Sequence, residues 1–387
     1  MTSFTLATSP ESSSISGKGY AVVKRAASLP RYAARPFAWA VAAAAAVGLY
    51  ASAGAAESFI DASKHVPSDG SADASAGIQR LIEANPNRTI YFPDGTYLLS
   101  HPVATPADPT KSVDLRLSNF AVFKAAEGWT NTEAMVRLGG IFPANDIRKP
   151  GSVYSLTGGI IDGSGVAAGV SIDSGRETKV RDVSMKNVTV GLRVKKGANS
   201  GSSDCDIADV NIVGSMAAGS IGVLVEGADN TFSNMRIAGV QTGVRLRSGG
   251  NLLTNIHPLY TFPKGVKYEE SAGFDDVTGD NSYRSCYSDQ FSTGFRFGAK
   301  AYVSVMDSCI AYWYASLKGR RHVGIGCAGR FRAHVRDMRF GFRAPAEGAV
   351  QVAVAVAEDG GDGFLHDCMI NEASVTDQQK KHRRYIR

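Results

Sequence analysis

The stretch Val180-Arg181-Asp182-Val183-Ser184-Met185 carries a pattern that returns along much of the chain. The pattern reads apolar, any residue, Asp/Asn/Ser, apolar, any residue, apolar, and its copies are 21 to 30 residues apart. A period of this length with alternation inside each unit is typical of a solenoid, because one unit cannot bury its apolar face alone. The recurring polar position falls at Asp182, Asp209, Asn234, Asn255, Ser285, Asp307, Asp337 and Asp367.

A second short pattern, Gly-apolar-any-apolar, accompanies the first in successive units. Side chains of a strand alternate between its two faces, so the apolar positions of both patterns predict one buried face. Two or three short strands per unit, separated by Gly, Asn or Ser turns, favour an all-β parallel β-helix. A leucine-rich repeat would need a Leu-x-x-Leu-x-Leu run, which the sequence lacks. The second pattern begins at Gly169, Gly191, Gly222, Gly243, Gly265 and Gly294.

The chain has 387 residues and a net charge of +6, and part of this charge sits near its ends. The charge of the body is closer to neutral, so nucleic acid is not expected as a partner. The five cysteines form no Cys-x-x-Cys and no His/Cys metal spacing, so no metal site is predicted from them. They are expected to be buried thiols, with a disulfide between Cys286 and Cys309 left open.

The first 56 residues are interpreted as a leader followed by a signal peptide or an N-terminal anchor. Residues 37–50 form an Ala-rich apolar run that follows four basic residues and precedes small residues suited to cleavage. Residues 57–375 are expected to form the β-helix, and residues 376–387 a basic tail. The body is therefore predicted to be secreted or periplasmic, with a membrane contact only through an uncleaved N-terminal segment.

A capping helix is predicted at the start of the β-helix. Residues 74–85 place Ile78, Leu81 and Ile82 on one helical face, and Asp73 is suited to cap the helix N-terminus. Residues 89–99 then predict a strand, a Pro-Asp-Gly turn and another strand. Such a helix would cover the open end of the stack, which otherwise exposes unpaired backbone and core.

Two stretches carry a family resemblance. Residues 90–97 read Ile-Tyr-Phe-Pro-Asp-Gly-Thr-Tyr, and residues 158–165 read Gly-Gly-Ile-Ile-Asp-Gly-Ser-Gly. They resemble the opening and one rung of the pectate lyase superfamily, which includes polygalacturonase-like proteins and phage tailspikes. The resemblance covers about residues 57–375. It implies a right-handed, single-stranded parallel β-helix that acts on or binds polysaccharide.

The catalytic motifs of that superfamily are incomplete in this chain. Asn-Thr-Asp, Gly-His-Gly and Arg-Ile-Lys are absent, and only Asp275-Asp276 matches the Asp-Asp motif of the hydrolases. The Arg-x-Pro-x-x-Arg motif of the best-known pectate lyases is absent as well. The resemblance therefore predicts the fold, and no particular reaction is carried over from it.

The third position of the Gly-apolar-any-apolar strand is basic in four units, at Arg193, Arg245, Lys267 and Arg296. These side chains are predicted to point outward on one wall with a rung spacing of about 4.8 Å, close to the length of a sugar residue. A ladder of cations at this spacing suits the carboxylates of an acidic polysaccharide. The alternative is that these residues only keep the outer face soluble.

A second outward column follows the Asp/Asn/Ser positions and contains His257 and Tyr287. His257 is a candidate acid or base near neutral pH. Tyr287 and the nearby Trp313 are candidate surfaces for stacking on sugar rings. The alternative for His257 is a structural role.

Three carboxylates, Asp275, Asp276 and Asp289, are the candidate catalytic acids. Hydrolysis of a glycosidic bond needs two carboxyl groups, whereas elimination from a uronate needs a base and neutralisation of the substrate carboxylate. No cofactor is predicted, and Ca²⁺ enters only if the protein is a lyase that uses the Asp cluster as oxygen ligands. The alternative is an acidic, Gly-rich turn.

These observations favour a secreted or periplasmic protein of the bacterial cell envelope that cleaves an acidic polysaccharide, as a lyase or as a glycoside hydrolase. One alternative is a non-catalytic protein of exopolysaccharide binding or assembly that uses the same groove. Another is a tailspike-like adhesion module. The missing hydrolase motifs favour the non-catalytic alternative, and the signal segment argues against the tailspike.

Overall fold

The computed structural model describes residues 59–139, 153–197, 202–263, 265–314, 317–343, 346–359 and 361–370. The chain divides into Met1–Ala56 and Glu57–Arg387, and all described residues belong to the second unit. The predicted leader, signal or anchor segment and basic tail lie outside the described residues. Within the described part, no helix is long and apolar enough to span a membrane.

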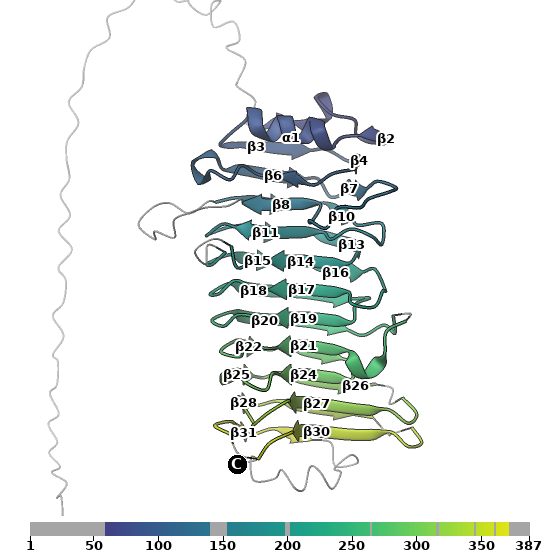
Figure 1. The fold of residues 1–387 in the computed structure, drawn as a ribbon, viewed down its shortest axis with the longest axis vertical. Coiled ribbons are helices and arrows are strands. Elements are labelled where there is room, and N and C mark those ends of the chain that lie inside the picture. Colours follow the sequence, from purple (N-terminus) through teal and green to yellow (C-terminus); the bar gives the residue numbers. More distant parts are fainter. Residues whose placement is uncertain are drawn as a thin grey trace, which may run out of the picture. The chain divides into compact units, whose positions relative to one another are not determined.

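The described unit is a parallel β-helix, which confirms the predicted all-β solenoid. Its strands form three columns that we call the first, second and third walls, and each strand pairs in parallel with strands one rung before and after it. Figure 1 shows the rungs stacked from α1 at one end to β30 and β31 at the other. The architecture therefore presents long outer walls to solvent and a continuous core inside.

The first wall opens each rung of the described unit. Its strands are β1 (Ile60–Asp61), β3 (Arg88–Phe92), β6 (Val113–Leu117), β9 (Ser155–Thr157), β12 (Lys179–Arg181), β15 (Asp206–Ala208), β18 (Thr231–Ala238), β20 (Leu252–Leu259), β22 (Ser282–Arg284), β25 (Ser304–Asp307), β28 (Ala333–Arg336) and β31 (Phe364–His366).

The second wall follows the first in each rung, and the long strands β18 and β20 belong to both walls. Its other strands are β2 (Asp69–Asp73), β4 (Gly95–Leu99), β7 (Ala121–Ala125), β10 (Ile160–Asp162), β13 (Ser184–Val188), β16 (Asn211–Gly214), β23 (Tyr287–Asp289), β26 (Ile310–Trp313), β29 (Arg339–Phe342) and β32 (Met369–Ile370).

The third wall contains the Gly-apolar-any-apolar strands. Its strands are β5 (Val103–Ala104), β8 (Val136–Gly139), β11 (Val170–Ser174), β14 (Val190–Val194), β17 (Ile221–Val225), β19 (Thr242–Leu246), β21 (Ala272–Asp276), β24 (Thr293–Phe297), β27 (Arg321–Cys327) and β30 (Val350–Val356).

The recurring polar residue forms the bend between the first and second walls. Its φ angle is positive in seven of the eight repeats, for example 58° at Asp182 and 53° at Asn234, a region that Asp and Asn adopt more readily than other non-glycine residues. The Nδ2 of Asn255 donates to the Oδ1 of Asn234 at 3.0 Å, so neighbouring bends are also linked. The prediction was wrong by one residue in one repeat. There Asp307 ends β25 in register with Arg284, and Ser308, with a φ of 54°, forms the bend.

A second polar ladder, which the sequence analysis did not find, runs inside the start of the first-wall strands. The backbone N–H of Asn230 donates to the Oδ1 of Asn251 at 3.1 Å, and the N–H of Asn251 donates to the Oδ1 of Asn281 at 3.0 Å. All three side chains are buried. The ladder satisfies backbone groups that would otherwise be unpaired at this turn, which ties three rungs together.

The predicted cap is helix α1 (Ser75–Ala84), whose Ile78, Leu81 and Ile82 are buried against the first rungs. The side chain of Gln79 joins the helix to β5, because its Oε1 accepts a hydrogen bond from the N–H of Ala104 at 2.9 Å. Asp73 lies one position before the N-cap and accepts from Ser75 and Ser100. The short 3₁₀ helices are η1 (Ala62–Lys64), η2 (Pro109–Lys111) and η4 (Tyr268–Glu270).

The segment that starts at Gly265 is not a strand of the third wall, so this part of the prediction was wrong. The strand of that rung is β21, which carries Gly273-Phe274-Asp275-Asp276 and pairs with β19 and β24. Residues 260–271 form an excursion instead, held by a small apolar cluster of Tyr260, Tyr268 and Phe291. This insertion makes the repeat 30 residues long, compared with 21 residues for the repeat directly before it.

The cysteines within the described residues are all free thiols, and four of the five are buried. Cys286 and Cys309 lie in successive rungs, and burial raises the pKa of the Cys286 thiol well above its ordinary value. The prediction of buried thiols is therefore confirmed except at Cys368, which is only partly buried, and no disulfide joins Cys286 and Cys309.

Candidate functional site

The predicted basic column lies on the outer face of the third wall, but with different members. Successive rungs place Arg193, Leu224, Arg245, Asp275 and Arg296 in register. Asp275 occupies the position that was predicted for Lys267. The prediction for Lys267 was wrong because it precedes η4, where its side chain is 80% exposed and pairs with Glu270 at 3.5 Å.

The arginines of this column are already paired with carboxylates of the same wall. The Nε atoms of Arg245 and Arg296 lie 2.8 and 2.7 Å from the two oxygens of Asp275. Arg193 pairs with Glu226 at 2.9 Å. Burial opposes the charge of Asp275, but Arg296 and Arg245 outweigh it and lower the pKa of this carboxyl. A substrate carboxylate would therefore have to displace a carboxylate that the protein itself supplies.

Asp275 and Asp276 point to opposite faces of β21. Asp276 is in the core, where its carboxylate accepts from Tyr283 at 2.8 Å, Ser304 at 2.9 Å and the N–H of Gly279 at 2.7 Å. Burial raises its pKa, although these hydrogen bonds act in the opposite direction. Both oxygens are thus occupied by donors of the protein, and Asp276 does not join Asp275 in one site.

Trp313 is not a surface for sugar stacking. It is 1% exposed, its Nε1 donates to the carbonyl of Phe291 at 2.7 Å, and its ring stacks on Phe342 with centroids 4.7 Å apart. The prediction failed because strand alternation turns this residue inward at the end of β26.

The second wall brings together three of the predicted residues, His257, Tyr287 and Asp289. The imidazole of His257 stacks on the ring of Tyr287 with centroids 4.1 Å apart and an interplanar angle of 10°. The hydroxyl of Tyr287 donates to Oδ2 of Asp289 at 3.3 Å, and Nε2 of His257 lies 3.7 Å from the same oxygen. Strands β20 and β23 position the three groups, because Leu259 and Asp289 are in register.

Two polar atoms of this group are buried without a hydrogen-bond partner, namely Nε2 of His257 and Oδ1 of Asp289. An unsatisfied buried polar atom costs about 1–3 kcal/mol, so the arrangement is not explained by stability. Burial, followed by the charge of Asp289, raises the pKa of Tyr287 well above its ordinary value, which keeps its hydroxyl a proton donor.

A depression of about 320 Å³ lies next to this group on the second wall, and His257, Arg236 and Lys186 are among its lining residues. Arg236 is in register with His257, one rung away. No carboxylate of the described residues forms an ion pair with Arg236 or Lys186. Lys186 was not among the predicted site residues, although it follows the outward residue Ser184 at the strand period of two, a spacing that indicates an outward side chain.

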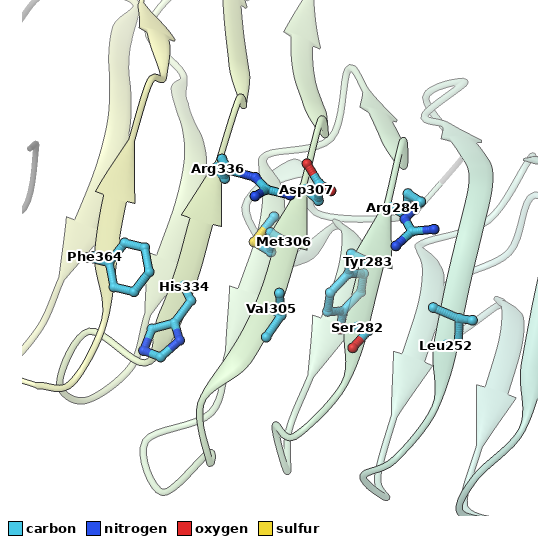
Figure 2. Close-up of a pocket in the computed structure, with 10 residues that line it drawn as sticks. All are labelled: Leu252, Ser282, Tyr283, Arg284, Val305, Met306, Asp307, His334, Arg336 and Phe364. Atoms are coloured by element: carbon cyan, nitrogen blue, oxygen red, sulfur yellow. Dashed lines mark hydrogen bonds and ion pairs between the residues drawn. The ribbon is translucent and has the colours of Figure 1, made fainter. Parts of the chain in front are cut away.

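A second depression, of about 390 Å³, lies on the first wall and contains none of the predicted site residues. Figure 2 shows Arg284, Asp307 and Arg336 along one line and Leu252, Val305, His334 and Phe364 along another. Its single acidic side chain, Asp307, pairs with Arg336 at 2.9 Å. The acid–base groups therefore favour the second wall as the candidate active site. Within the described part of the chain, no three His, Cys, Asp or Glu residues cluster closely enough to hold a metal ion.

Solved structures with the same fold include an alginate lyase from Paenibacillus sp. str. FPU-7, which is 16% identical with a TM-score of 0.52 over 73% of this chain and 97% of that one. A tailspike mutant of Escherichia coli bacteriophage HK620, in complex with a pentasaccharide, is 12% identical with a TM-score of 0.58. That match covers 82% of this chain and 66% of the tailspike chain. No curated protein matches the sequence.

A family model described as rhamnogalacturonase A/epimerase, pectate lyase-like, matches residues 64–257, which is half of the chain. The matched range runs from the first 3₁₀ helix, through the cap and the first rungs, to His257 on the second wall. Together with the parallel β-helix, this match shows that the chain belongs to the pectate lyase-like rhamnogalacturonase A/epimerase family.

Proposed function

We propose that this protein binds an acidic polysaccharide along the second wall and cleaves it by β-elimination. The observation that carries the proposal is the grouping of His257, Tyr287 and Asp289 beside Arg236 and Lys186, two cations that form no ion pair with a described carboxylate. The family supports carbohydrate as the substrate class. Two proteins of the same fold support it as well, since one is named an alginate lyase and the other was solved with a pentasaccharide.

In the proposed reaction, Arg236 and Lys186 neutralise the carboxylate of a uronate residue, which acidifies the neighbouring C5–H bond. His257 takes this proton while the C4–O bond breaks and a C4=C5 double bond forms. The imidazolium then returns the proton to the departing glycosidic oxygen, so no water is consumed.

Asp289 and Tyr287 have supporting roles in this scheme. The carboxylate of Asp289 faces Nε2 of His257, which leaves Nδ1 as the basic nitrogen and stabilises the imidazolium. Tyr287 fixes both partners, because its ring stacks on the imidazole and its hydroxyl donates to Asp289. The 3.7 Å separation of His257 and Asp289 is expected to shorten when substrate binds.

Hydrolysis is less well supported on this wall. Glycosidases place two carboxyl groups about 5–9.5 Å apart. Among the described strands of the second wall from β13 to β32, Asp289 is the one acidic residue. The next acidic residue, Asp162 on β10, is five rungs away, roughly 24 Å at about 4.8 Å per rung.

A second candidate function is binding without cleavage, in exopolysaccharide assembly or adhesion. The observation that favours it is the distance of 3.7 Å between His257 and Asp289, which is longer than a hydrogen bond. In either case we propose that the protein acts outside the cytoplasm, as the Ala-rich apolar run of residues 37–50 indicates.

The test is to incubate the full chain with a panel of acidic polysaccharides that includes alginate and polygalacturonate. Elimination gives an unsaturated uronate that absorbs in the ultraviolet, together with new reducing ends. New reducing ends without the ultraviolet absorbance would show that the protein cleaves by hydrolysis and not by elimination. Retardation in a gel that contains the polymer, with neither product, would favour binding without cleavage.

A further inference from the structure

The depression on the first wall lies along two parallel rows of residues that run across five rungs. The first row, which we call the strip, contains Leu252, Ser282, Val305, His334 and Phe364, and each member is in register with the next. The second row, which we call the charged row, contains Thr254, Arg284, Asp307, Arg336 and His366 in the same register.

The strip exposes apolar groups that the fold does not need to expose. Leu252 and Phe364 are each 39% exposed and Val305 is 48% exposed, although the outward positions of a solenoid wall are free to be polar. His334 stacks on Phe364 with centroids 4.4 Å apart, and its Nε2 is held by the carbonyl of Asp362 at 2.9 Å. These contacts fix a flat ring at one end of the strip (Figure 2).

The charged row itself contains two arginines and one aspartate, and Arg284 is its arginine without an ion pair to a carboxylate of the described residues. Arg336 pairs with Asp307 at 2.9 Å and with Asp337, beside the row, at 3.7 Å. Hydrogen bonds from Arg336 and Ser308, followed by the charges of Arg336 and Arg284, lower the pKa of the Asp307 carboxyl. An occupant with carboxylates on one edge and apolar faces on the other would match both rows.

Rungs about 4.8 Å apart repeat at about the length of a sugar residue, and the ring faces of sugars stack on apolar and aromatic side chains. The chain's own C-terminal residues do not fit as an occupant, because residues 380–387 are mostly basic and would meet Arg284 and Arg336. A glycan that carries carboxylates fits the rows better.

We propose that the strip and the charged row form a second, non-catalytic binding site for an acidic glycan chain. The choice of glycan class depends on the proposed function, whereas the existence of the site does not depend on cleavage. Strand β20 connects the two sites, because Leu252 lies at its first-wall end and His257 at its second-wall end. A polymer held on the first wall would therefore raise the local concentration of chain segments near His257.

The test compares Val305→Asp with Val277→Asp, since Val277 is 47% exposed and lies after β21, outside the strip. Both changes are made in the full chain and combined with His257→Ala, so that the polymer is not consumed. Retardation is then measured in gels that contain alginate or polygalacturonate. We expect Val305→Asp to weaken retention about tenfold, since it adds a negative charge and removes an apolar contact. Val277→Asp should not change it.

Equal retention of the two variants, or no retention of the His257→Ala protein by either polymer, would overturn the proposal. So would a change from dimer to monomer in Val305→Asp alone, which would identify the strip as a contact between copies. Circular dichroism verifies that both variants fold. The proposed cleavage can fail independently of this site. In that case the protein with an intact His257 releases no unsaturated product, whereas Val305→Asp still weakens retention by the polymer.

Discussion

The third and second walls carry the same kinds of side chains but use them differently. On the third wall, Arg245 and Arg296 both pair with Asp275, so each of these guanidinium groups already has a carboxylate partner. On the second wall, no carboxylate within the described part of the chain pairs with Arg236, and a histidine and a carboxylate approach each other without a hydrogen bond. A row of cations predicts a ligand site only where the fold leaves those cations unpaired.

The largest effect should come from the second wall. Replacing His257 by Ala removes the proposed base, and the loss of acid–base catalysis is expected to lower kcat by about 10²–10⁴-fold. The measurement is the initial rate of unsaturated product at saturating polymer. His101→Ala, an exposed histidine near the cap, is the matched control and should keep its rate. If the rate of His257→Ala stays within a few-fold of the wild-type rate, His257 is not the base and the second wall is not the active site.

A change that touches neither wall's outer face tests stability alone. Asn251→Ala removes the middle of the buried Asn ladder and leaves the N–H of Asn230 without its acceptor. We expect a loss of about 3 kcal/mol in the free energy of unfolding, measured by urea denaturation. The KM for polymer should remain unchanged, and an altered KM would mean that the ladder supports the site.

The two walls can be compared directly through one substitution on each. Arg236→Gln should raise KM about tenfold, roughly the 1.4 kcal/mol of one charge-assisted hydrogen bond, with little change in stability. Arg245→Gln should lower the unfolding free energy by about 1.5 kcal/mol, because Asp275 loses one partner, and should leave KM as it is. If both variants raise KM alike, the third wall also binds substrate.

The smallest effect concerns pH. The pKa of Asp275 is lowered in the folded protein, so its ion pairs stabilise the fold above the unfolded value of 3.8 and are lost as the pH falls through the lower folded value. Asp275→Asn should therefore be less stable than wild type by about 1 kcal/mol at neutral pH. The difference should vanish on acidification below that window, as measured by thermal unfolding. If Asp275→Asn remains less stable than wild type in acid, the loss of stability comes from packing and not from the ion pairs.

The fold was largely predictable from the sequence. The spacing of Asp182, Asp209 and Asn234 marks bends that need positive φ angles, and the alternation around them defines one buried face. The error at Ser308 arose because Asp307 and Ser308 both suit the bend, and only the strand register distinguishes them. The same alternation put His257 and Tyr287 in one column, where the structure finds them stacked.

The members of the candidate site were only partly predictable. Asp289 was grouped with Asp275 and Asp276 because the three residues are close in sequence. In the structure, Asp275 and Asp276 end β21 of the third wall, whereas Asp289 ends β23 of the second wall. The segments at Gly265 and Gly273 compete for one place in the third wall, and the pattern favours the first because Asp276 is a poor core residue. In the structure, the segment at Gly273 forms the strand, because Tyr283, Ser304 and the N–H of Gly279 donate hydrogen bonds to the Asp276 carboxylate in the core.

By itself, the sequence determined that rungs stack and which side chains turn outward, because the alternation and the bend residues are local properties of each unit. The tertiary structure decided which outward residues become neighbours, because that depends on the length of every excursion between rungs. Asp275, and not Lys267, thus lies between two arginines and forms an ion pair with each of them. On the second wall, no carboxylate of the described residues pairs with Arg236, and its Nη1 donates instead to the backbone carbonyls of Met235 and Asn255.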